Sequence, residues 1–202
     1  LYPVARRSNI RIVEVDAARP VDGALPGIAV QPGVTDGLNS QPWQSSNNMG
    51  RMADVLAADL SRLAPNAKPK IDANLAALKQ RLLKLTADSE ARLAKADNLT
   101  VVSLSDHFAY LVSSLNLEVV STDARPDADW TAEDLLKLSA ELKDNEVAVV
   151  LHHRQPSEAV KAAVTAGGSQ LLVLNVDSAE PVTELQSNVD QVIKALTPSP
   201  PG

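Results

Sequence analysis

The three histidines are the best candidates for metal binding or acid–base catalysis, because they lie near the ends of predicted strands. His107 follows an apolar run at 100–104, and His152 and His153 follow another at 147–151. A neutral imidazole binds metal ions, and it also acts as a general acid or base. Polar residues in strand–helix loops also cap helices or pack in the core, so a structural role is the alternative.

The same pattern recurs at the ends of the other predicted strands. Polar side chains gather in four short segments: 103–107, 121–123, 151–154 and 174–177. Besides the histidines, these segments include carboxylate and amide groups at Asp106, Asn175 and Asp177. Open parallel sheets bind ligands beyond the carboxyl ends of their strands. We therefore expect a polar ligand site at that edge of a sheet.

Four strand–helix units in the second half of the chain must position these residues. The predicted strands cover 100–104, 118–121, 147–151 and 170–174, and the predicted helices cover 106–116, 131–143, 157–166 and 182–196. Thr131 with Asp134 predicts a capping box, and Gly167 with Gly168 predicts a helix stop. Nearly all-apolar strands alternating with helices indicate an α/β fold with a parallel sheet covered on both faces.

The first half of the chain has a different organisation. Residues 10–15 alternate as a strand does, and 16–48 form a Pro/Gly-rich loop that we interpret as functional or as a crossing between lobes. Trp43 in that loop is either a staple that pins it to a lobe or a wall of the ligand cleft. Helical spacing follows at 52–63 and at 69–96, and the second run is roughly 40 Å long. It is expected to brace two lobes through a buried stripe: Ile71, Leu75, Leu78, Leu82 and Leu85.

Composition excludes several classes of function. The chain has no cysteine, which excludes disulfides, thiolate metal sites and cysteine catalysis. The net charge is −6, no block of Lys or Arg gathers, and aromatic residues make up 2% of the chain, so no nucleic-acid partner is expected. No apolar run approaches the ~20 residues of a membrane span. Common nucleotide, zinc-protease and hydrolase motifs are also absent from the sequence.

Four segments carry a family resemblance. They read NSQPW at 39–43, VVSLSDHFAY at 101–110, VVLHHRQPS at 149–157 and LVLN at 172–175. In this order they resemble the motifs Asp-Pro-His-x-Trp, Val-Val-x-x-His-Asp-Ala-Phe-x-Tyr, Glu-Pro-Gln-x-Ser and Val-Leu-Asp. Those motifs belong to the zinc/manganese solute-binding proteins of bacterial ABC importers, and the resemblance runs from about residue 1 to residue 196.

The resemblance implies a two-lobed α/β receptor whose parallel sheets are covered by helices and whose lobes are joined by one long helix. The expected parts are a remnant of the N-terminal lobe with a cleft loop at 1–48, a helical connector at 49–98, a C-terminal lobe at 99–196 and a disordered tail at 197–202. Most of the N-terminal lobe, with the family's first histidine, is expected to be lacking. The implied function is periplasmic: the receptor binds solute between its lobes and delivers it to an ABC permease in the membrane.

The site residues depart from the family's pattern. The family's two matched histidines fall on Gln41 and Ser105, its glutamate falls on His153, and its aspartate falls on Asn175. Neutral Gln, Ser and Asn are poor zinc ligands, so His153 would be the one strong ligand, and His107 would substitute only if its loop changes register. The expected cleft lining is completed by other residues: Trp43, Asp106 and Asp177. Because neighbouring side chains on a strand alternate, His152 is expected to pack or cap.

The expected cargo is Zn or Mn, or else a small polar solute or a metal complex, and no other cofactor is implied. Two other classes of function remain open. One is a non-transport interaction protein that keeps the fold and has lost the site. The other is a small α/β enzyme that uses His152 or His153 as a general base, although the resemblance implies that the protein is not an enzyme.

Overall fold

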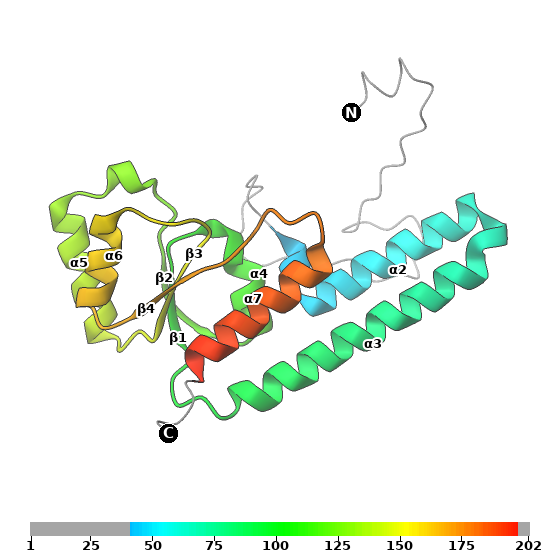
Figure 1. Cartoon of the computed structure of the whole chain (residues 1–202), viewed down its shortest axis with the longest axis horizontal. Coiled ribbons are helices and arrows are strands. Elements are labelled where there is room, and N and C mark those ends of the chain that lie inside the picture. Colours follow the sequence, from blue (N-terminus) through cyan, green and yellow to red (C-terminus); the bar gives the residue numbers. More distant parts are fainter. Residues whose placement is uncertain (1–40, 198–202) are drawn as a thin grey trace, which may run out of the picture.

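The structure, a computed structural model, describes residues 41–197 of the chain (Figure 1). The predicted strand at 10–15, the loop as far as residue 40 and the tail beyond residue 197 lie outside the described residues. The predicted boundaries of the remnant lobe, the connector and the C-terminal lobe therefore stay a prediction.

One four-stranded parallel sheet organises the second half of the chain. The strands are β1 (Thr100–Ser103), β2 (Glu118–Thr122), β3 (Val149–His152) and β4 (Gln170–Val173), in the order β2-β1-β3-β4. The predicted α/β fold class is confirmed. β3 begins two residues later than predicted, because the N–H of Val147 donates to the carbonyl oxygen of Leu142 in the turn that closes the preceding helix.

Helices cover both faces of the sheet. The helix α4 (Ala109–Ser114), which the 3₁₀ turn Asp106–Phe108 precedes, lies with α7 (Pro181–Leu196) on one face, and α5 (Ala132–Asp144) lies with α6 (Glu158–Ala166) on the other (Figure 1). Neighbouring strand residues serve opposite faces: Val101 packs in the α4/α7 core and Val102 packs in the α5/α6 core, both fully buried. This alternation is why the strands are apolar at nearly every position.

The helix ends follow the local sequence signals. At the start of α5, the hydroxyl of Thr131 accepts from the N–H of Asp134 at 3.2 Å, and the Asp134 carboxylate accepts from the N–H of Thr131 at 3.1 Å. The predicted capping box is thus present. The chain leaves α6 through Gly167 and then Gly168, whose φ of +82° is the left-handed conformation that favours glycine.

A helical hairpin precedes the sheet. It consists of α2 (Ser46–Leu63) and α3 (Lys68–Leu93), which are joined by the 3₁₀ turn Pro65–Ala67 (Figure 1). Of the five positions expected on the buried stripe of α3, the structure buries Leu82, and the other four are half-buried. The reason is that α3 packs against α2 and α7 while its first turns extend beyond the sheet. No helix within 41–197 combines the length and the apolar character needed to cross a membrane.

Candidate functional site

The three histidines converge at the carboxyl ends of β1 and β3. These strands are hydrogen-bonded neighbours in the sheet, so the segments that follow them emerge side by side. The ring centres of His107 and His153 are 4.6 Å apart with the planes tilted by 57°. The ring centres of His152 and His153 are 5.0 Å apart and nearly stacked. The three rings thus form a row with His153 in the middle.

His152 is the buried end of that row, with 3% of its surface exposed. Its Nδ1 accepts from the N–H of Arg154 at 3.1 Å, and its Nε2 lies 3.7 Å from a carboxylate oxygen of Asp127. Burial lowers the pKa of His152, and the Asp127 carboxylate offsets this in part. The neutral ring therefore has both nitrogens directed at neighbouring groups of the protein. This is the packed role that the sequence predicts for His152.

His153 is half-buried and has a different partner. Its Nδ1 lies 2.9 Å from the hydroxyl oxygen of Ser105, and that oxygen also accepts from the N–H of His107 at 3.2 Å. Burial, followed by the neighbouring His107, His152 and Arg154, lowers the pKa of His153, so the ring is neutral at neutral pH. Among the described residues none hydrogen-bonds to its Nε2. A neutral imidazole with one nitrogen held by a hydroxyl and the other free is competent to bind a metal ion.

His107 forms the other end of the row. Its Nδ1 is 3.1 Å from the amide nitrogen of Gln41, and its Nε2 is 3.9 Å from a carboxylate oxygen of Asp106. The amide nitrogen of Gln41 also donates to the carbonyl oxygen of Val176 at 3.1 Å. The segment that precedes α2 is thereby attached to the strand ends of the sheet.

The remaining predicted cleft residues have a less direct relation to the histidines. Asp106 is exposed beside His107. Asn175 and Asp177 are exposed. The side-chain oxygen of Asn175 accepts from the N–H of Asp177, so this amide stabilises the loop in which it lies. Trp43, in the 3₁₀ turn Pro42–Gln44, is half-buried against the α4/α7 core, which is the packing that a staple makes. The structure thus brings Gln41 and Ser105 to the histidines and leaves Asn175 and Asp177 in a loop of their own.

Sequence reasoning missed a buried polar network next to this site. The amide nitrogen of Gln44 donates to the Glu184 carboxylate at 2.8 Å, and the Gln44 oxygen accepts from the amide of Asn188 at 3.3 Å. All three side chains are buried. Glu184 and Asn188 are four residues apart and share one face of α7 with apolar neighbours. Polar residues at that spacing on an otherwise apolar face were the signal that could have revealed them.

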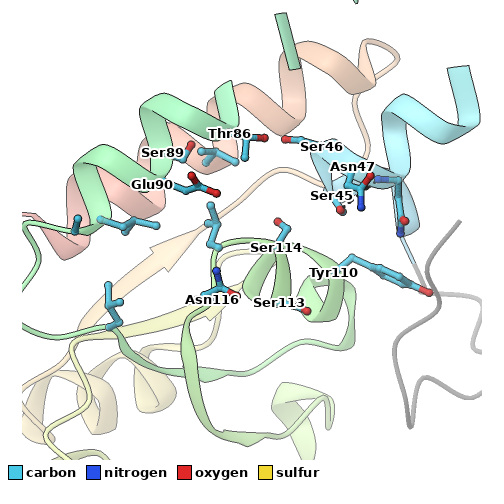
Figure 2. Close-up of a pocket in the computed structure, with 16 residues that line it drawn as sticks. Ser45, Ser46, Asn47, Thr86, Ser89, Glu90, Tyr110, Ser113, Ser114 and Asn116 are labelled. Carbon is cyan, nitrogen blue, oxygen red and sulfur yellow. Dashed lines mark hydrogen bonds between the residues drawn. The ribbon is translucent and has the colours of Figure 1, made fainter. Parts of the chain in front are cut away.

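A separate hollow of about 460 Å³ lies between α2, α3 and α4 (Figure 2). Neutral hydroxyl and amide groups dominate the residues labelled around it, with Glu90 as their carboxylate and no imidazole (Figure 2). The three histidines therefore do not line this hollow and lie instead at the carboxyl ends of β1 and β3. Within 41–197 the structure contains no group of three or more His, Asp or Glu side chains placed to hold a metal ion.

Comparison with known proteins identifies the family to which this chain belongs. Residues 5–197 match the family described as zinc-uptake complex component A, periplasmic. The chain belongs to this family, and the resemblance inferred from the four sequence segments is confirmed. The family is one of solute-binding receptors and not of enzymes. The comparison with curated proteins found no match.

Solved structures agree with this assignment. A mutant of FpvC from Pseudomonas aeruginosa is 26% identical, with a TM-score of 0.65. The match covers 78% of this chain and 61% of that one. FpvC in complex with Ni²⁺ is 25% identical with a TM-score of 0.61, and the match covers 80% of this chain and 64% of that one. The Zn(II)-bound ZnuA-like domain of AdcA from Streptococcus pneumoniae, 20% identical, shares the fold with a TM-score of 0.64 over 77% of this chain and 62% of that one. The chain thus spans about three fifths of the length of the solved structures it matches.

Proposed function

We propose that this chain is the periplasmic solute-binding component of an ABC importer and that it binds a divalent transition metal, free or complexed, at the carboxyl ends of β1 and β3. Membership of the zinc-uptake family supports the receptor role. FpvC, among the solved structures, has been captured with Ni²⁺ and with Mn²⁺. Delivery to a membrane permease is part of the same proposal.

The observation that carries the proposal is the position of His153. It stands between two other imidazoles, it is neutral, and its Nδ1 is held by the buried Ser105 hydroxyl. A metal ligand of this type usually has its second ring nitrogen hydrogen-bonded, which fixes the ring and raises its basicity. His153 meets this requirement through Ser105, and its Nε2 is the ligand atom.

The site should be weak for a bare ion. Zinc sites take three or four protein ligands, whereas the described residues include no group of three or more His, Asp or Glu side chains placed to hold a metal ion. Water, or donor atoms that a metal complex brings with it, would complete the coordination. This arrangement favours a cargo that arrives with part of its own ligand set.

Calorimetric titration of the chelator-treated chain with Zn²⁺, Mn²⁺ and Ni²⁺ at pH 7.5 tests the proposal. His153→Asn keeps a polar atom near the Nδ1 position and removes Nε2, so affinity should fall by about tenfold or more. His152→Asn is the matched control, because it makes the same change in a ring already packed within the protein. Circular dichroism of both variants verifies that each one folds.

Three outcomes decide the matter. Loss of binding in His153→Asn alone supports the metal-receptor proposal. Loss in His152→Asn alone overturns the assignment of the ligand. If the unaltered chain binds none of the three ions, metal binding fails, and the lack of a three-ligand group then favours the other reading, an interaction protein on the same fold.

A further inference from the structure

Gln41 holds its amide in one orientation through contacts on two sides. Its side chain is buried, with 6% of the residue exposed. Both hydrogens of the amide nitrogen have acceptors: the carbonyl oxygen of Val176 and Nδ1 of His107, each at 3.1 Å. A carbonyl oxygen can only accept, so rotating the amide by 180° would set two acceptors against each other at Val176.

The buried network enforces the same orientation from the other side. The carboxylate of Glu184 accepts from the amide nitrogen of Gln44 at 2.8 Å and from the N–H of Ser178 at 2.7 Å. Because this carboxylate accepts, Gln44 must direct its NH₂ group toward it. The same nitrogen of Gln44 is 3.4 Å from the amide oxygen of Gln41, which leaves the Gln41 nitrogen facing His107.

His107 therefore receives a hydrogen bond at Nδ1 and cannot carry a proton there. A neutral imidazole has one protonated nitrogen and one acceptor nitrogen, so its proton is on Nε2. That nitrogen lies on the side of the Asp106 carboxylate, at 3.9 Å, where an N–H is favoured. One lone pair is occupied by Gln41 and the other nitrogen carries hydrogen, so this ring has no free lone pair for a metal ion.

His153 differs from His107 in the chemistry of its partner. Ser105 presents a hydroxyl, which can either donate to Nδ1 or accept from it. His153 can therefore place its proton on Nδ1 and expose Nε2 as a ligand. Gln41 presents an NH₂ group to His107. Because this group can only donate, Nδ1 of His107 must accept and cannot carry the proton.

We infer that Gln41 is a specificity-determining residue that fixes His107 in the Nε2–H tautomer and so excludes this second imidazole from metal binding. The consequence of this inference, a weak metal site with a single histidine ligand, rests on the proposed function. The tautomer itself follows from the hydrogen bonds alone. A metal ion alone is thereby disfavoured relative to a metal complex that supplies its own donor atoms.

Long-range ¹H–¹⁵N NMR of the histidine-labelled full chain tests the tautomer directly. The expected result is an Nε2–H tautomer at His107 in the unaltered chain and a mixture of tautomers in Gln41→Leu, which has a similar volume and no donor. An Nδ1–H tautomer in the unaltered chain, or an unchanged Nε2–H tautomer in Gln41→Leu, overturns the inference. Gln41→Ala replaces Gln41→Leu if the larger side chain prevents folding.

Zinc titration then tests the consequence. Gln41→Leu should bind Zn²⁺ about tenfold or more tightly than the unaltered chain, since a second imidazole becomes available. The double variant Gln41→Leu/His107→Asn should lose that gain, and a gain that persists there overturns the inference. If the unaltered chain binds no zinc but the tautomer result holds, the proposed metal function fails while the fixed tautomer stands.

Discussion

The sheet layer, which consists of β1–β4 with the helices α4–α7, is packed differently from the helical hairpin of α2 and α3. Residues in the centre of the sheet, such as Val149, Val150 and Leu151, have no exposed surface. In the hairpin, by contrast, α2 and α3 leave several leucines exposed over 42–65% of their surface: Leu56, Leu60, Leu63 and Leu83. Within residues 41–197, helices cover both faces of the sheet, whereas the distal part of the hairpin is formed by its own two helices (Figure 1). Stability should therefore depend mainly on the sheet layer.

A pair of leucine truncations should produce the largest contrast between the two regions. Leu142 is fully buried in α5, and Leu83 is 65% exposed in α3. Leu142→Ala should lower the free energy of unfolding by about 2–5 kcal/mol, because it leaves a cavity. Leu83→Ala should change it by less than about 0.5 kcal/mol. Urea unfolding followed by circular dichroism measures both, and similar costs at the two sites would contradict the comparison.

A pair of glycine substitutions tests packing density at a finer level. A Cβ added at Gly167 would lie 2.7 Å from Cβ of Leu142, whereas one added at Gly50 in α2 would lie 3.8 Å from a methyl of Leu82. Gly167→Ala should cost about 1–3 kcal/mol through overpacking. Gly50→Ala should stabilise the chain by about 0.5–1 kcal/mol, because alanine is the better helix former. Thermal unfolding gives both signs, and a loss of stability at Gly50 would show that the hairpin is packed as tightly as the sheet layer.

The smallest expected effect concerns the acid stability of the loop between β2 and α5. The hydrogen bond from the Arg125 side chain to Asp123 lowers the pKa of that carboxyl below its usual 3.8. A lowered carboxyl pKa gives stability that is present above the unfolded-state value and is lost as the pH falls through the folded-state value. Asp123→Asn should thus be slightly less stable than the unaltered chain near pH 6.

That difference should shrink as the pH falls below 3.8, because Asp123 is protonated first in the unfolded chain and only at lower pH in the folded chain. Urea midpoints measured from pH 3 to pH 7 check this. A difference that stays constant across the range would mean that the Asp123–Arg125 ion pair adds nothing to the stability of the sheet layer.

The sequence predicted the elements of the sheet layer because their signals are local. Apolar strands, the Thr131–Asp134 capping box and the glycines after α6 each depend on a few adjacent residues. The burial along α3 was less predictable. Ile71 and Leu75 have the same periodicity as Leu82, but only the position of a partner decides which of them is covered.

The sequence by itself predicted that the three histidines would lie near strand ends and that His152 and His153 would differ in environment. The replacement of the family's metal ligands stays what the resemblance implies. Tertiary structure decided which strands are neighbours, since nothing local places β3 rather than β4 beside β1. It also decided the partner of each ring: Gln41 reaches His107 across 66 positions, and Ser105 reaches His153 across 48. Proton placement on an imidazole depends on the group it faces, and that group is known only once the chain has folded.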